Sequence, residues 1–150
     1  SSAVKIFGVN ISGSDVSRMY SEEGIIAIVN HCMASHSQIE TVVMGAAQHR
    51  EMQERITRAT GARAIPPTPS FGVWAANIAQ LDAFFTPDTS SVHLAAAFNI
   101  PIVVLYVHDR ADLMPWYPYD TPCIPVETTT GTVAEIPIRD ILRAVDQLLS

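Results

Sequence analysis

Apolar residues in this chain gather into short runs that do not alternate with polar ones. Two such runs, at 81–86 and at 100–107, are separated by a stretch of small and hydroxyl-bearing residues. Because neither run alternates, we expect both faces of each strand to be covered, as in a parallel sheet that is flanked by helices. Thr89 or Ser90 is suited to cap a helix between the runs, and Pro101 ends that helix. The stretch therefore predicts a strand, a helix and a second strand in succession.

The rest of the chain repeats this alternation of strand and helix. Further apolar runs predict strands at 4–11, 39–44, 62–65 and 123–126. Apolar residues at helical spacing predict one helix that begins after Ser21 and others at 48–59, 70–78 and 138–149. The expected fold class is therefore α/β. It is a single domain, residues 1–150, with a doubly wound, mostly parallel, Rossmann-like sheet that carries helices on both faces.

In an open sheet of this kind, ligands bind beyond the carboxyl ends of the strands, at the point where the strand order reverses. If the order is 3-2-1-4-5, the loops at 12–15 and 88–93 are neighbours at that point. These two loops carry the most hydroxyl groups and glycine of all the carboxyl-end loops. The sequence therefore predicts a pocket for a nucleotide or a phosphate group. Neither a GxGxxG nor a GxxxxGK[ST] motif is present, so the pocket is neither a dinucleotide fingerprint nor a P-loop.

Composition narrows the range of partners. The formal net charge is −6 and there is no basic stripe, which argues against nucleic acid as a partner. No apolar run reaches the roughly 18 residues that a membrane-spanning helix needs. The two cysteines, Cys32 and Cys123, lie far apart in the sequence and indicate neither a disulfide framework nor a zinc site. Cys32 falls on the apolar side of a helical pattern, so we expect a buried thiol there.

The segment Asp88–His93 holds more polar groups than one helix cap requires. It offers a carboxylate, three hydroxyls and an imidazole within six positions. A helix that begins just after a buried strand presents free N–H groups and a partial positive charge, which favour an anion. The plainer interpretation is an ordinary capped turn, in which Asp88 caps the helix and His93 is a structural histidine.

The stretch PDTSSVHLAAAFNIPIVVLY resembles the signature of the C-terminal domain of family 9 glycosyltransferases, the heptosyltransferase-like enzymes of lipopolysaccharide synthesis. The usual form of that signature is Asp-Thr-Gly, two variable residues and His, followed by a small-residue helix and an apolar strand. The order and spacing of other segments support the resemblance across most of the chain; they are 11–14, 44–46, 65–66 and 135–137.

The resemblance implies the C-terminal half of a GT-B enzyme, the domain that binds a nucleotide-sugar donor, typically ADP-heptose. Positions that match the family pattern imply the donor contacts. Asp88, Thr89 and His93 would lie at the pyrophosphate and sugar, with Ser90 in place of the usual glycine. The phosphates would contact Ser12, Gly13 and Ser14, together with Arg18 as a basic residue, and Thr68 would lie beside the adenine. Residues 47–49 stand where the heptosyltransferases place an acidic residue for the ribose, which makes a different nucleotide sugar an open alternative.

The same resemblance implies an inverting glycosyltransferase that needs neither a metal ion nor another cofactor. Its acceptor-binding N-terminal domain, with the catalytic carboxylate, is absent from this chain, so we expect no catalytic residue here. We expect the 150 residues alone to be inactive, whereas the full-length protein would be an enzyme. Contact with a membrane would come only through the acceptor. The implied location is the cytoplasm, with a peripheral place at the inner membrane left open for the full-length protein.

Two other functions stay open on the sequence. One is a non-catalytic nucleotide-binding α/β module, flavodoxin-like in outline, and the other is a sugar epimerase that shares the GT-B architecture. Arg18 is alternatively a surface cation. His31, His36 and His49 are expected at the surface. The combination of His108, Asp109 and Asp112 suggests a metal ion but is common in loops, and Trp116, Tyr117 and Tyr119 are expected to pack against the absent domain.

Overall fold

The structure, a computed structural model, describes residues 4–107, 122–128 and 130–150. They form a six-stranded sheet in the order β3-β2-β1-β4-β5-β6, in which every pair of neighbouring strands is parallel. The strands are β1 (Ile6–Asn10), β2 (Glu40–Met44), β3 (Arg63–Ala64), β4 (Ala83–Pro87), β5 (Ile102–Val107) and β6 (Cys123–Thr128). The doubly wound α/β fold is therefore confirmed, and the sheet has the order 3-2-1-4-5 that the sequence analysis assumed, with β6 beside β5.

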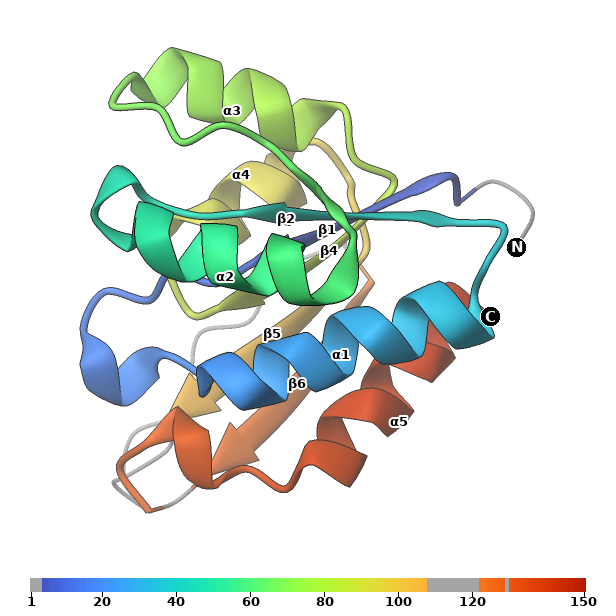
Figure 1. The fold of residues 1–150 in the computed structure, drawn as a ribbon. Coiled ribbons are helices and arrows are strands. Elements are labelled where there is room, and N and C mark those ends of the chain that lie inside the picture. Colours follow the sequence, from blue (N-terminus) through green and yellow to red (C-terminus); the bar gives the residue numbers. More distant parts are fainter. Residues whose placement is uncertain (1–3, 108–121, 129) are drawn as a thin grey trace.

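Helices cover both faces of this sheet (Figure 1). They are α1 (Glu22–Ser35), α2 (Arg50–Thr60), α3 (Phe71–Ala79), α4 (Ser90–Ala97) and α5 (Ile138–Leu149). One apolar core joins α1, α2 and α5 to one face of the sheet, and a second core joins α3 and α4 to the other face. Phe84 and Phe85 are both fully buried because successive side chains of β4 enter opposite cores. This two-sided burial explains why the strands do not alternate in sequence, and each such phenylalanine contributes about 1.5–3 kcal/mol through burial.

The ends of the helices follow the local signals in the sequence. The side chain of Ser21 accepts a hydrogen bond from the Gly24 N–H and so caps α1. Thr89, rather than Asp88 or Ser90, is the N-cap of α4, and its side chain accepts from the Ser91 N–H. Gly61 ends α2 in the left-handed conformation, with φ of 80°. We expected Pro101 to end α4, but the helix already stops at Ala97, before the chain turns through a positive φ at Asn99.

The edge strands differ from their predicted lengths. β3 has only two residues where four were expected, because Pro66 and Pro67 follow and cannot donate to a neighbouring strand. β6 extends to Thr128, beyond the predicted end at Val126, since it pairs with β5 along its whole length. Among the described residues, no helix has both the length and the apolar character needed to cross a membrane.

Candidate functional site

The reversal of strand order lies between β1 and β4, which are neighbours in the sheet although two strands and three helices separate them in sequence. After β1 the chain turns into the loop at 11–15, and after β4 it enters α4 at once. The carboxyl ends of both strands therefore deliver their loops to the same edge of the sheet. The loops at 12–15 and 88–93 are therefore neighbours, as the sequence analysis expected for this strand order.

A cavity of about 310 Å³ opens at this edge. Its wall is rich in hydroxyl groups and small residues from five different segments of the chain. The lining residues are Asn10, Ser12, Gly13, Ser14, Ala46, Thr68, Trp74, Thr89, Ser90 and Ser91. The size and the mixture of apolar and polar walls are typical of a site for a small organic molecule.

A buried amide fixes the floor of the cavity. Asn10 is almost fully buried, and its Nδ2 donates to Thr86 Oγ1 at 3.0 Å and to the Ser12 carbonyl oxygen at 3.3 Å. Its Oδ1 accepts from the Ser12 N–H at 3.1 Å. One side chain thus joins the end of β1 to the end of β4 and also holds the first residue of the loop. Such a fully bonded polar group in a dry setting fixes the local backbone.

The Ser12 side chain holds the neighbouring loop in turn. Its Oγ accepts from the Ala46 N–H at 2.7 Å and lies 2.7 Å from Nδ1 of His49. Next to it, Gly13 passes very close to the chain that returns from the turn: an added Cβ would lie 2.8 Å from the Arg18 carbonyl oxygen. A residue with a Cβ would force the backbone apart here, so the close approach of Gly13 to Arg18 requires glycine.

The first turn of α4 forms the opposite wall. This helix begins just beyond the end of β4, where a helix N-terminus favours negative charge, and two of its first N–H groups, those of Ser91 and Val92, are already bonded to Thr89. Ser90 is exposed, whereas Ser91 is buried and accepts a hydrogen bond from Trp74 Nε1 at 2.9 Å. That bond ties α3 to α4 and holds the indole at the rim of the cavity. The site therefore combines a helix N-terminus, which is suited to a negative charge, with a fixed aromatic side chain.

Three of the expected donor contacts form a second group that does not line the cavity. Burial raises the pKa of the Asp88 carboxyl, while the charges of Arg18 and His93 oppose that rise. Arg18 ends a short 3₁₀ turn and has Nε 3.9 Å from a carboxylate oxygen of Asp15. The charges of Arg18 and His93 are therefore close enough to act on the Asp88 carboxylate, which lies beside the α4 N-terminus.

The structure brings the other six expected residues to the cavity wall: Ser12, Gly13, Ser14, Thr68, Thr89 and Ser90. Ser91, which belongs to the expected segment 88–93, also lines it, as do Asn10 and Trp74, which sequence reasoning did not find. Asn10 could have been found from the sequence, because it is a polar residue at the end of an apolar run that predicts a buried strand. Trp74 gave none, because its position depends on how α3 packs beside α4. His108, Asp109, Asp112, Trp116, Tyr117 and Tyr119 lie outside the described residues.

All three histidines that were expected at the surface are only partly exposed. His31 and His36 are only partly exposed, and both contact Asp146 of α5 rather than solvent alone. His49 is also partly buried, against Ser12. Cys32 is fully buried, as predicted, and both cysteines are free thiols.

Comparison with known proteins identifies the family. The family model described as glycosyltransferase family 9 (heptosyltransferase) matches residues 20–135. Since the match covers well over half of the chain, this protein belongs to glycosyltransferase family 9. The family predicted from the stretch at Asp88–His93 is confirmed. No curated protein matches the sequence.

Solved structures share the fold at low sequence identity. A family 9 glycosyl transferase from Veillonella parvula is similar with a TM-score of 0.79 and 18% identity over 99% of this chain and 47% of that one. ADP-heptose lps heptosyltransferase II of E. coli is similar with a TM-score of 0.77 and 20% identity, over 99% of this chain and 47% of that one. E. coli heptosyltransferase WaaC with ADP-2-deoxy-2-fluoro heptose has a TM-score of 0.76 and 16% identity, over 98% of this chain and 44% of that one. The chain thus spans less than half the length of each of these relatives.

Proposed function

We propose that this chain is the domain that binds the nucleotide-sugar donor of an inverting family 9 glycosyltransferase. The observation that carries the proposal is the hydroxyl-rich cavity at the point where the strand order reverses, with the α4 N-terminus in its wall. A nucleoside diphosphate has the two features that such a cavity recognises, an anionic pyrophosphate and a flat base. Family membership makes the attached group a sugar.

The diphosphate belongs at the α4 N-terminus. There the hydroxyls of Thr89 and Ser90 would donate to phosphate oxygens, and the partial positive charge of the helix N-terminus would favour the anion. Ser12, Gly13 and Ser14 face them across the cavity, and Arg18 supplies the cation beside Asp88. As the sugar leaves the diphosphate, negative charge grows on the phosphate oxygens. Donors already fixed by the fold stabilise that charge without reorganisation.

The base belongs toward Trp74 and Thr68. Trp74 is held by its bond to Ser91, so its ring is placed before any ligand arrives. We assign ADP-heptose as the donor, on the support of the family description and of the similar heptosyltransferase solved with an ADP-heptose analogue. The acceptor would be a lipopolysaccharide precursor, which the part of the protein beyond this chain would hold.

A binding experiment tests the proposal directly. Isothermal titration of the chain with ADP, UDP and GDP should show a preference for ADP. Thr89→Ala removes a hydroxyl at the α4 N-terminus, and we expect ADP to bind about tenfold more weakly, equivalent to about 1.4 kcal/mol. Ser21→Ala is the matched control because it removes the N-cap hydroxyl of α1, away from the cavity. Equal ADP affinity in both variants and the wild type would reject the site.

A further inference from the structure

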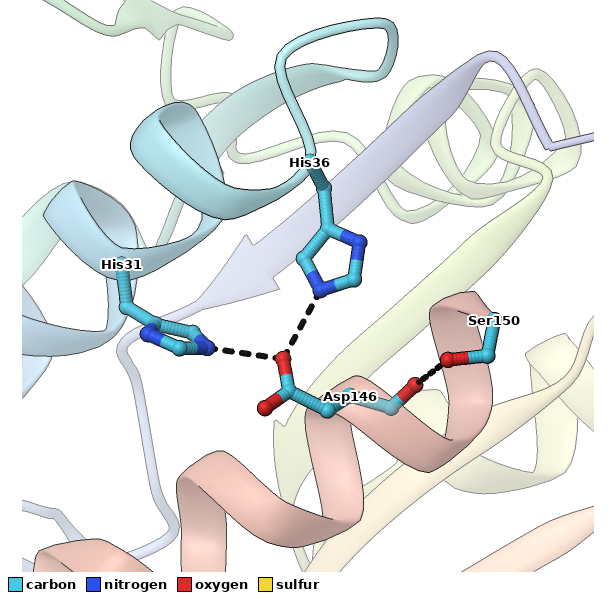
Figure 2. A network of polar contacts seen from close by, with 4 residues as sticks. All are labelled: His31, His36, Asp146 and Ser150. Carbon is cyan, nitrogen blue, oxygen red and sulfur yellow. Dashed lines mark hydrogen bonds and ion pairs between the residues drawn. The ribbon is translucent and has the colours of Figure 1, made fainter.

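Two imidazoles converge on a single carboxylate oxygen between α1 and α5 (Figure 2). Nε2 of His31 lies 2.7 Å and Nε2 of His36 lies 2.8 Å from Oδ1 of Asp146. His31 is in α1, His36 follows its last residue, and Asp146 is more than a hundred residues away in sequence. The tertiary fold alone assembles this group.

The three side chains are shielded but accessible. The exposed fractions are 25% for His31, 15% for His36 and 45% for Asp146, and the two rings meet edge to face with centroids 6.1 Å apart. Burial raises the pKa of the Asp146 carboxyl, but hydrogen bonds from His36 and His31 outweigh it and hold the pKa below its ordinary value. Among the described ion pairs, those of Asp146 are with these two histidines and with no lysine or arginine.

The donor set and its spacing are those of a transition-metal site. One ligand atom from each residue lies within 4.8 Å of the other two. Zinc bonds of about 2.0–2.2 Å in a tetrahedron separate ligand atoms by about 3.3 Å, so small side-chain rotations would admit the ion. Four residues separate His31 from His36, within the spacing common for paired histidine ligands. Imidazole donors favour zinc and its neighbours over calcium and magnesium, which prefer oxygen.

We propose that His31, His36 and Asp146 bind a divalent transition-metal ion of the zinc class, which cross-links α1 to α5. Water completes the coordination on the exposed side of Asp146. His36 lies just before β2, whereas the candidate cavity opens beyond the carboxyl ends of the strands, so the two sites occupy opposite ends of the sheet. In Figure 1 this end of α1 lies near the C-terminal end of α5. The ion would stabilise the packing of these helices and take no part in nucleotide binding.

Titration of the tag-free, metal-free chain with Zn²⁺ tests the proposal, with the absorption spectrum of bound Co²⁺ as a second reading of the coordination. We expect one saturable zinc site, a tetrahedral cobalt spectrum, and a higher unfolding temperature with zinc. His31→Gln, His36→Gln and Asp146→Asn should each weaken zinc binding at least tenfold and abolish the thermal shift.

Two variants serve as matched controls. His49→Gln removes a histidine outside the group, and Asp140→Asn removes a carboxylate on the same helix, so both should bind zinc as the wild type does. Circular dichroism checks the fold of each variant, and three separate ligand variants keep the test valid if one of them fails to fold. The absence of saturable zinc binding, or equal affinity in the ligand and control variants, overturns the proposal.

Discussion

Asn10 and Thr86 are 76 positions apart in sequence, yet Nδ2 of Asn10 donates to Oγ1 of Thr86 at 3.0 Å in the buried floor of the candidate cavity. The bond joins β1 to β4 across the reversal of strand order. Thr86 Oγ1 in turn donates to the Pro87 carbonyl oxygen at 2.7 Å. A chain of hydrogen bonds therefore leads from the loop after β1 to the last residue of β4, immediately before the α4 N-terminus.

Truncation of this amide should destabilise the fold. Asn10→Ala removes the donor to Thr86 and leaves the Ser12 N–H without its acceptor, so we expect the free energy of unfolding to fall by about 2 kcal/mol. Asn30→Ala is the control, since Asn30 is exposed within α1, where alanine is the better helix former. Urea unfolding measures both, and an equal stability of the two variants would contradict the role of Asn10.

The close approach at Gly13 should control nucleotide affinity. In Gly13→Ala the new Cβ would meet the Arg18 carbonyl group, a backbone contact that only a shift of the loop relieves. We expect at least a tenfold loss of ADP affinity by calorimetry. In Gly72→Ala the nearest atom is 3.8 Å away, so the control should keep its affinity and gain about 0.5 kcal/mol of stability within α3.

Alkaline pH should destabilise the protein through Cys32. Burial, together with the nearby charge of Asp146, raises the pKa of this thiol to about 12. The folded chain then keeps a proton that the unfolded chain loses above about pH 9, so the free energy of unfolding falls as the pH rises from there to about 12. The slope from this one group is about 1.4 kcal/mol per pH unit. In Cys32→Ala, the free energy of unfolding should fall less steeply with pH over this range, by that amount. If the variant and the wild type show the same dependence on pH, Cys32 is not a buried neutral thiol.

Donor binding should not depend on a metal ion. The described residues that line the cavity include no carboxylate that would clamp a magnesium–diphosphate complex. We therefore expect ADP affinity to be the same in EDTA and in magnesium. Titrations in the two buffers measure it, and a tenfold loss on chelation, about 1.4 kcal/mol, would show that a metal ion takes part.

The 150 residues alone should bind donor without transferring sugar. Transfer needs a general base within hydrogen-bond reach of the acceptor hydroxyl, and an acceptor held in line with the anomeric carbon. Asp88 is placed beside Arg18 and the helix end assigned to the diphosphate, so it is not suited to that role. Incubation with radiolabelled ADP-heptose and a truncated lipopolysaccharide acceptor should give no product. Robust transfer by this chain would place the base within it.

The sequence by itself determined the layers and the class of the protein. Local signals sufficed for the helix ends at Ser21 and Gly61, because a cap depends on residues within one turn of it. Unbroken apolar runs such as 100–107 predicted buried parallel strands, since burial on both faces leaves no room for polar alternation. The motif at Asp88–His93 indicated the family. The loops at 12–15 and 88–93 could be paired because strand order in such folds follows a few rules.

Only the tertiary structure decided which side chains meet. Trp74 reaches Ser91 because α3 packs beside α4, and no spacing in the sequence encodes that packing. The same holds for Asp146, which the sequence shows as one acidic residue on the polar side of the last helix. Its meeting with His31 and His36 depends on the angle and register at which α5 lies against α1. Those quantities are set by the interlocking of many side chains in the shared core, which is a property of the whole fold and not of any local segment.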